Sequence, residues 1–162
     1  MIKLFTKKGM NNYNERIAVL ERKLNHQQKE VGVAMNQGAE TWHDNSPFEC
    51  ARADLTVTDR MVSELYDNLR YAQIREYPRP NGLDTVEYGT RVVFLRDRKR
   101  QEFTLVGYGH GDIDRNRIHY DSPLAQVLIG SKVGQSFDGE VNGRQFSFHI
   151  LEVYPITDYD LL

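Results

Sequence analysis

The residues best suited to chemistry lie in one short stretch, residues 39–50, which reads AETWHDNSPFEC. It holds the only tryptophan of the chain, Trp42, beside His43, and it carries carboxylates at Glu40 and Asp44. Long segments with the repeat of a coiled coil run on either side, so the stretch falls on the turn between two predicted helices. Packing alone gives no reason for an aromatic residue and two carboxylates on a solvent-exposed turn. The stretch is therefore a candidate functional segment.

The other residues capable of chemistry form no recognisable motif. The sequence has no glycine loop that would cradle phosphate, no paired CxxC and no HExxH. Four histidines scattered over predicted turns and strands are interpreted as ordinary surface or core residues, namely His43, His110, His119 and His149. Cys50 has no base beside it in the sequence, so we interpret it as a packed thiol and not as a nucleophile.

A basic run, RDRKR at residues 96–100, falls between two predicted strands. Its arginines and lysine could contact phosphate. A solvated hairpin turn is the simpler interpretation and the one that we prefer.

The segments that flank the turn each carry an apolar seam on which steps of three and four residues alternate. The first seam comprises Tyr13, Ile17, Leu20, Leu24, Gln27, Val31 and Ala34, and the second comprises Phe48, Ala51, Leu55, Thr58, Val62, Leu65, Leu69 and Ala72. The polar interruptions Gln27 and Thr58 lie at similar distances from the turn, so they are expected to face each other. Neither stripe can be buried alone, which predicts an antiparallel hairpin.

The ends of both helices are marked in the sequence. Thr6 is a suitable N-cap for the first helix, and Ser46-Pro47-Phe48-Glu49 forms a capping box with proline at the first helical position. The second helix should end before Pro78, because a residue ahead of proline resists the helical conformation. Arms of about 30 residues would reach roughly 45 Å. A dimerisation or spacer element is the alternative interpretation of such a coiled coil.

The second half of the chain changes to a period of two and predicts a twisted antiparallel sheet with one short helix, an α+β module. The predicted strands are residues 90–95, 102–106, 117–120, 136–141 and 144–153, and the helix begins at Ser122-Pro123 and ends at Gly130. Asn142-Gly143 is a strong hairpin signal. The predicted domains are a coiled-coil hairpin at residues 1–77, a linker at 78–85 and a globular domain at 86–162.

Composition narrows the class of protein. The chain has 162 residues, 40% of them hydrophobic and 27% charged, with a formal net charge of −2, which is typical of a globular protein and gives no general argument for nucleic-acid binding. The single cysteine suits a reducing cytoplasm. The N-terminus lacks the apolar segment of a secretory signal, and no apolar run approaches the ~20 residues of a membrane span, so we expect a cytoplasmic protein with no membrane partner.

Three segments together resemble the bacterial Gre factors. FTKKGMNNYNERIAVLERKL, residues 5–24, resembles the opening of that family, where Thr-x-x-Gly precedes a leucine-rich helix. FECAR at residues 48–52 and DRM at 59–61 resemble its second helix. DSPLAQVLIG, residues 121–130, is close to the family signature Asn-Ser-Pro-x-Ala-Arg-x-Leu-Ile-Gly. The resemblance covers nearly the whole chain in the same order, and the last signature is its most specific part.

The resemblance implies a fold and a mechanism. Gre factors bind bacterial RNA polymerase through an FKBP-like C-terminal domain at the mouth of the secondary channel. Their coiled coil enters the channel, where acids at its tip help to hold the second catalytic magnesium ion, and the polymerase then cleaves the 3′ end of backtracked RNA. Carboxylates suit that role because magnesium prefers hard oxygen ligands. The family therefore implies an accessory factor with no cofactor of its own, sharing the magnesium of the polymerase, and a monomer that affects the RNA end indirectly.

Carried over to this chain, the resemblance assigns the tip acids to Asp44 and Glu40, which would assist catalysis and share the metal only in the complex. Trp42, His43 and Asn45 become tip contacts. The polymerase-docking residues become Asp121, Ser122 and Pro123.

The tip departs from the family pattern Gly-Asp-Leu-x-Glu-Asn-Ala-Glu-Tyr. Asp44-Asn45 matches the second acid and its asparagine, but counting places either Thr41 or Glu40 at the first acid. Pro47 replaces a further glutamate of the family, and Gln126 replaces the arginine of the C-terminal signature. Two functions therefore remain open, a factor that stimulates cleavage and an inhibitor or regulator that occupies the channel without cleavage.

A remoter alternative is a prolyl isomerase of the FKBP type, which would need an apolar pocket lined by aromatic residues. The sequence offers only Phe94, Phe103, Phe146 and Phe148, which alternate with polar residues on predicted strands.

Overall fold

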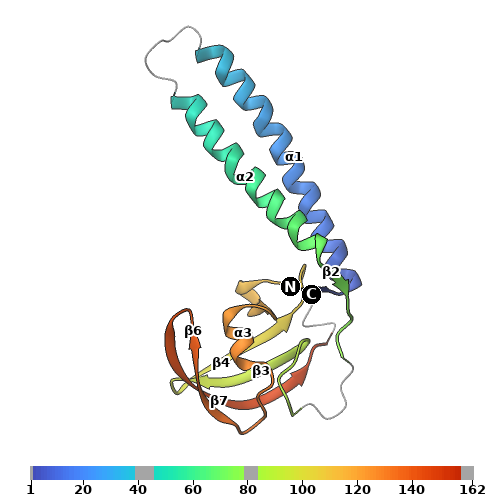
Figure 1. The fold of residues 1–162 in the computed structure, drawn as a ribbon, viewed down its shortest axis with the longest axis vertical. Helices are drawn as coiled ribbons and strands as arrows, with labels where there is room; N and C mark the ends of the chain where they lie inside the picture. The colour runs from blue at the N-terminus through green and yellow to red at the C-terminus, as the bar shows by residue number, and fades with distance from the viewer. Residues whose placement is uncertain (1, 39–45, 79–83, 158–162) are drawn as a thin grey trace. The chain divides into compact units, whose positions relative to one another are not determined.

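The computed structural model describes residues 2–38, 46–78 and 84–157 (Figure 1). The contacts divide the chain into two compact units. The hairpin unit comprises residues 1–3 and 11–72, and the sheet unit comprises residues 4–10 and 73–162. The start of the first helix and residues 73–77 therefore group with the sheet unit.

The hairpin unit contains α2 (Ser46–Arg70) and all but the first turn of α1 (Lys7–Gly38), and the two helices run antiparallel (Figure 1). The side chain of Asn68 donates to the Tyr13 hydroxyl (3.0 Å), and the Tyr66 hydroxyl donates to Glu21 (2.7 Å). This register places Gln27 and Thr58 at about the same level, and both are buried. Within the two helices, every predicted seam position is buried or half-buried, which confirms the heptad pattern.

The end of α2 differs from the prediction. The helix ends at Arg70, whereas the predicted seam continued to Ala72, which begins the short strand β2 (Ala72–Ile74). β2 pairs with β1 (Lys3–Phe5), and the amide of Lys3 donates to the carbonyl of Tyr71 (2.8 Å). The sequence analysis predicted neither strand, since only the pairing of two distant segments stabilises them.

The sheet unit contains a five-stranded sheet in the order β5-β4-β3-β7-β6 (Figure 1). The strands are β3 (Thr90–Arg96), β4 (Lys99–Val106), β5 (Arg117–His119), β6 (Ser136–Val141) and β7 (Arg144–Pro155). Neighbouring strands are antiparallel except β4 and β5, which are parallel, so the sheet is mixed and not wholly antiparallel as predicted. The loop from β4 to β5, which includes the 3₁₀ turn η1 (Ile113–Arg115), brings the chain back in the same direction.

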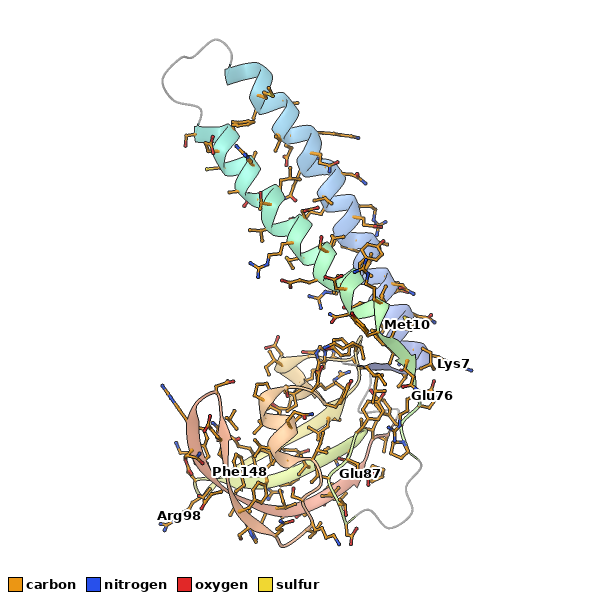
Figure 2. All side chains as sticks on the ribbon, viewed as in Figure 1. Lys7, Met10, Glu76, Glu87, Arg98 and Phe148 are labelled. Carbon is orange, nitrogen blue, oxygen red and sulfur yellow. The ribbon has the colours of Figure 1, made fainter. Side chains whose placement is uncertain are left out.

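One face of this sheet packs against the single helix α3 (Pro123–Leu128). Phe94, Phe148 and Ile150 alternate onto that face and are fully or almost fully buried with Leu128. Figure 2 marks Phe148 within this layer. The rings of Phe94 and Phe148 lie 6.0 Å apart, and Phe103 and Phe146 pack against the same cluster. The four phenylalanines proposed for an isomerase pocket therefore contribute to the packed core.

Two hairpin turns have central residues with positive φ. Asn142 and Gly143 connect β6 and β7 with φ values of 52° and 78°, which confirms the Asn-Gly turn. The predicted six-residue turn between β3 and β4 is wrong, because the strands extend further and leave only Asp97 and Arg98, at φ values of 48° and 65°. Asp97 pairs with Ser147 on β7, which extends the ladder beyond its predicted end.

Within the described residues, no helix has both the length and the apolar character required to cross a membrane.

Candidate docking site

The structure places part of the predicted site. Glu40, Trp42, His43, Asp44 and Asn45, the predicted tip residues, lie outside the described residues. Asp121, Ser122 and Pro123 are described, and we call these three residues the docking loop. Cys50 is exposed on α2, so its interpretation as a packed thiol is wrong.

The docking loop follows β5 and forms the start of α3. Ser122 has an extended backbone conformation, and its hydroxyl accepts a hydrogen bond from the amide of Ala125 (3.4 Å), while Pro123 takes the first helical turn. These contacts confirm the predicted cap. Pro123 is exposed, whereas Asp121 and Ser122 are half-buried. The loop therefore presents a fixed surface with proline at its most exposed point.

Tyr108 supports the carboxylate of the loop. Its hydroxyl donates a 2.7 Å hydrogen bond to Oδ2 of Asp121. The ring of Tyr108 is buried, with its centroid 4.7 Å from the ring of His119 and 5.3 Å from that of Phe5. A buried and packed donor holds the carboxylate in one orientation, because the phenol cannot rotate away without losing those contacts.

Two further hydrogen bonds hold the backbone beside the loop. The amide of Ser122 donates to the carbonyl of His119 (2.9 Å), and the side-chain amide of Gln126 donates to the carbonyl of Tyr120 (2.9 Å). Gln126 replaces the arginine of the family signature, and its side-chain amide here holds the backbone at Tyr120. Sequence reasoning missed Tyr108, since nothing in the primary structure links it to a carboxylate thirteen positions later.

Further aromatic residues surround Tyr108. The ring of Tyr88 lies 5.4 Å from that of Tyr120 and 5.0 Å from that of Tyr77. Burial raises the pKa of Tyr77 to about 12, although its hydroxyl accepts a hydrogen bond from Gly107. Burial also raises the pKa of Tyr88, which donates to the carbonyl of Arg75 (3.0 Å). These phenols therefore stay neutral at physiological pH and act as structural hydrogen-bonding groups.

The same unit fixes the first turn of α1. The Thr6 hydroxyl accepts a hydrogen bond from the amide of Gly9 (2.9 Å), as predicted for an N-cap, and lies 2.7 Å from Nε2 of His110. Burial lowers the pKa of His110 to about 4, helped by the charges of Lys8 and Arg117. The ring is therefore neutral near pH 7, and its tautomer decides whether Nε2 or the Thr6 hydroxyl donates in this hydrogen bond.

The carboxylate of Glu76 provides a second cap for this end of α1. Its Oε1 accepts a hydrogen bond from the amide of Lys7 (2.9 Å), and Figure 2 shows the two residues side by side. Negative charge at a helix N-terminus is favourable, because the unpaired amides and the helix dipole are positive there.

Two glycines allow the start of α1 to approach the loop after β4. A Cβ atom on Gly109, which has a φ of +84°, would lie 1.9 Å from the carbonyl oxygen of Gly9. A Cβ atom on Gly9 would lie 2.5 Å from the carbonyl oxygen of Tyr108. The Thr-x-x-Gly motif thus has a structural explanation, since Thr6 caps the helix and Gly9 permits backbone contact.

The described residues contain no cluster of three or more metal-ligating side chains. The described residues form a rigid surface at the docking loop, which carries the carboxylate of Asp121, the capped start of α3 and the exposed Pro123, with buried tyrosines beneath it. Such a surface is suited to recognising a partner, because little side-chain freedom is lost on binding.

Comparisons with known proteins show which family the chain resembles. A family model described as "Transcription elongation factor, GreA/GreB, C-term" matches residues 79–155. The transcription elongation factor GreA of Nitrobacter hamburgensis is 30% identical over 112 residues, which cover 68% of this chain and 70% of that protein. GreA of Nitratiruptor is also 30% identical, over 113 residues that cover 68% of this chain and 69% of the relative. The structure of Gfh1 of Thermus thermophilus is 19% identical, covering 95% of this chain and 99% of that one, with a TM-score of 0.45.

Proposed function

Because this chain belongs to the GreA/GreB family of transcription elongation factors, we propose that it binds bacterial RNA polymerase and modulates elongation from the secondary channel. The docking loop is the contact with the channel rim. The tip of the hairpin reaches towards the polymerase active site and promotes cleavage of backtracked RNA. The protein acts as an accessory factor, a monomer in the cytoplasm, and the polymerase carries out the chemistry.

The observation that supports docking is the preorganised geometry of residues 121–123. Tyr108 holds Asp121 at 2.7 Å, Ser122 caps α3, and Pro123 has a restricted backbone and an exposed ring. The surface already has a single conformation before a partner binds, so binding loses little conformational entropy.

The length of the hairpin supports the second part of the proposal. α1 has 32 residues, which corresponds to roughly 48 Å of helix. An arm of that length carries its turn far from the base of the helix. Glu40 and Asp44 on that turn are the carboxylates that would help to hold the magnesium ion of the polymerase, and Trp42, His43 and Asn45 are the neighbouring contacts. No metal bound by the isolated protein is required.

A transcript-cleavage assay on stalled, backtracked elongation complexes tests both parts. The double variant Asp121→Ala with Pro123→Ala should weaken polymerase binding while the isolated protein stays folded. Asp44→Ala should bind nearly as well as the unmodified protein and lose the effect on backtracked complexes. Unchanged affinity of the double variant in a competition assay would overturn the docking assignment, and full activity of Asp44→Ala would overturn the tip assignment.

The rebuilt tip gives the same assay a second informative outcome. Asp44-Asn45 preserves one acid of the family pattern, but the first acid has no single equivalent. If the unmodified protein binds polymerase and slows nucleotide addition without releasing cleaved RNA, the chain is a channel-occupying inhibitor that uses the same docking loop.

A further inference from the structure

β6 is the last strand of the five-stranded sheet (Figure 1), and its partner β7 shows which of its backbone groups are used. The amide and the carbonyl of Ser147 both bond to Asp97, just after β3. They are therefore not available to Asp138, the residue of β6 that pairs with Ser147. Ile150, in contrast, bonds to the carbonyl of Gln135, just before β6. Because hydrogen-bonded pairs alternate along an antiparallel ladder, Asp138 directs its N–H and C=O groups away from β7.

The same alternation gives β6 a row of unused backbone groups along its outer side. The residues that carry them are Ser136, Asp138 and Glu140, and all three are exposed. Within the part of the chain that the structure describes, no hydrogen bond reaches these outward groups. Such a row is a template on which a further strand can pair.

On the face towards α3, this edge offers apolar contacts to an added strand. Phe137 alternates onto that face, where its ring stacks on the buried ring of Phe148 with the centroids 5.4 Å apart. Gly139 lies against α3, since a Cβ atom on it would come within 2.5 Å of Cγ1 of Val127. Phe137 and Val127 are only half-buried. Apolar side chains of an added strand would cover their remaining exposed surface, which is favourable.

The opposite face of the edge is acidic. Asp138 and Glu140 alternate onto it, and Asp97 joins Asp138 in the wall of a hollow of about 310 Å³. Among the described residues, none of these three carboxylates forms an ion pair. The adjoining hollow contributes one cation, Arg98, so the carboxylates predominate. Complementary charge therefore favours a strand with basic side chains on this face.

We propose that the edge of β6 binds an extended segment of a partner protein, which adds a strand to the sheet and alternates basic with apolar residues. The basic residues lie beside Asp138 and Glu140, and the apolar residues lie beside Phe137 and Val127. Main-chain hydrogen bonds supply affinity in this mode of binding, and alternate side chains supply specificity. A second copy of this chain fits less well, because two β6 edges would bring like charges together. The surface shares no residue with the docking loop, so this interaction does not depend on polymerase docking.

NMR titration of the ¹⁵N-labelled full chain with the end-blocked peptide KVKVKVK tests the proposal. The amide signals of residues 136–141 should shift, while those of residues 121 and 122 in the docking loop should not. Amides 136, 138 and 140 should also become protected from hydrogen exchange, because their N–H groups gain partners. KKVVVKK has the same composition without the alternation, and EVEVEVE reverses the charge, so both should bind much more weakly. Equal binding of KVKVKVK and KKVVVKK, or no binding of KVKVKVK at millimolar concentration, would overturn the proposal.

Methylated peptides test the main-chain pairing itself. Alternate amides of an added strand point towards β6, and the others point to solvent. N-methylation of all lysine amides and N-methylation of all valine amides of KVKVKVK should therefore differ, one preventing binding and the other being tolerated. Equal affinities of the two methylated peptides would show that the peptide does not pair as a strand.

Variants of the protein test the charge complementarity. Asp138→Asn with Glu140→Gln should weaken binding of KVKVKVK roughly threefold to tenfold, because two exposed ion pairs are lost. Glu102→Gln with Glu152→Gln removes the same charge from the same face, on β4 and β7, and should change the affinity little. Equal losses for the two double variants would overturn the assignment of a basic strand. So would self-association in sedimentation accompanied by shifts of the β6 signals without peptide, which would identify a second copy as the occupant.

Discussion

Replacing Tyr108 with phenylalanine would remove the hydroxyl that orients Asp121 and leave the ring that packs against Phe5 and His119. A hydrogen bond to a charged group contributes about 1.5–3 kcal/mol, and we expect the lower part of that range because Asp121 is half-buried and retains access to water. The variant should therefore lose about 1.5–2 kcal/mol of unfolding free energy. No large cavity forms, since only one oxygen atom is removed.

Thermal unfolding and a polymerase competition assay measure the two consequences. For a chain of 162 residues, a change of about 1 kcal/mol shifts the unfolding midpoint by roughly 2–4 °C, so the shift should be measurable. Polymerase affinity should fall by roughly fivefold or more, because Asp121 then samples several orientations before binding.

Tyr154→Phe provides a matched control, because its hydroxyl also donates to a carboxylate, that of Glu152, but at an exposed position on β7. Its loss should change the stability by less than about 0.5 kcal/mol and leave polymerase binding unchanged. If Tyr108→Phe behaves like Tyr154→Phe in both assays, the tyrosine does not position the docking loop.

Two further predictions concern the base of α1. Gly109→Ala should destabilise the protein by more than about 2 kcal/mol in denaturant unfolding, because the residue has positive φ and its new Cβ would lie 1.9 Å from the Gly9 carbonyl oxygen. Gly130→Ala is the control: it also has positive φ (+88°) but has open space around it, so it should cost only about 1 kcal/mol, and equal losses for the two variants would contradict the close approach. The second prediction is that His110 makes the stability depend on pH. Its pKa in the folded protein, about 4, lies below its ordinary value of 6.5. Its contribution to the free energy of unfolding is therefore fully present above pH 6.5 and is lost as the pH falls towards 4, by at most about 1.4 kcal/mol per pH unit. Between pH 4 and 6.5, the free energy of unfolding should change less steeply with pH in His110→Gln than in the unmodified protein. An unchanged slope would show that other groups cause the pH dependence.

Local patterns were sufficient to predict much of the fold. The alternation of three and four residues identified the buried seam from Tyr13 to Leu69, and Ser122-Pro123 identified the start of α3, because helix periodicity and capping act within a few residues. The Asn142-Gly143 turn was predicted for the same reason, since asparagine and glycine tolerate the positive φ that a two-residue hairpin turn requires.

The features missed from the sequence depend on distant partners. β1 forms because Lys3 meets Tyr71, and Asp121 is fixed because Tyr108 approaches it from the loop after β4. The β3–β4 turn was predicted too long, because its arginines and lysine read as solvated loop while the pairing of Asp97 with Ser147 extends the strands. Neither the residue composition nor the hydrophobic periodicity of the sequence reports such long-range contacts. At these places tertiary contacts override local propensity.

The residues that support the docking loop are separate from those that form the hairpin seam. Every described support of the docking loop, including Tyr108, His119 and Gln126, belongs to residues 4–10 or 73–162. The hairpin seam, from Tyr13 onward, uses a different set of contacts within residues 11–72. Because substitutions without shared partners have nearly additive effects, a change at the tip and a change at Tyr108 should combine without coupling in polymerase affinity. A tip can therefore be rebuilt, as the spacing of Glu40 and Asp44 indicates, while the surface that would recognise the polymerase keeps its geometry.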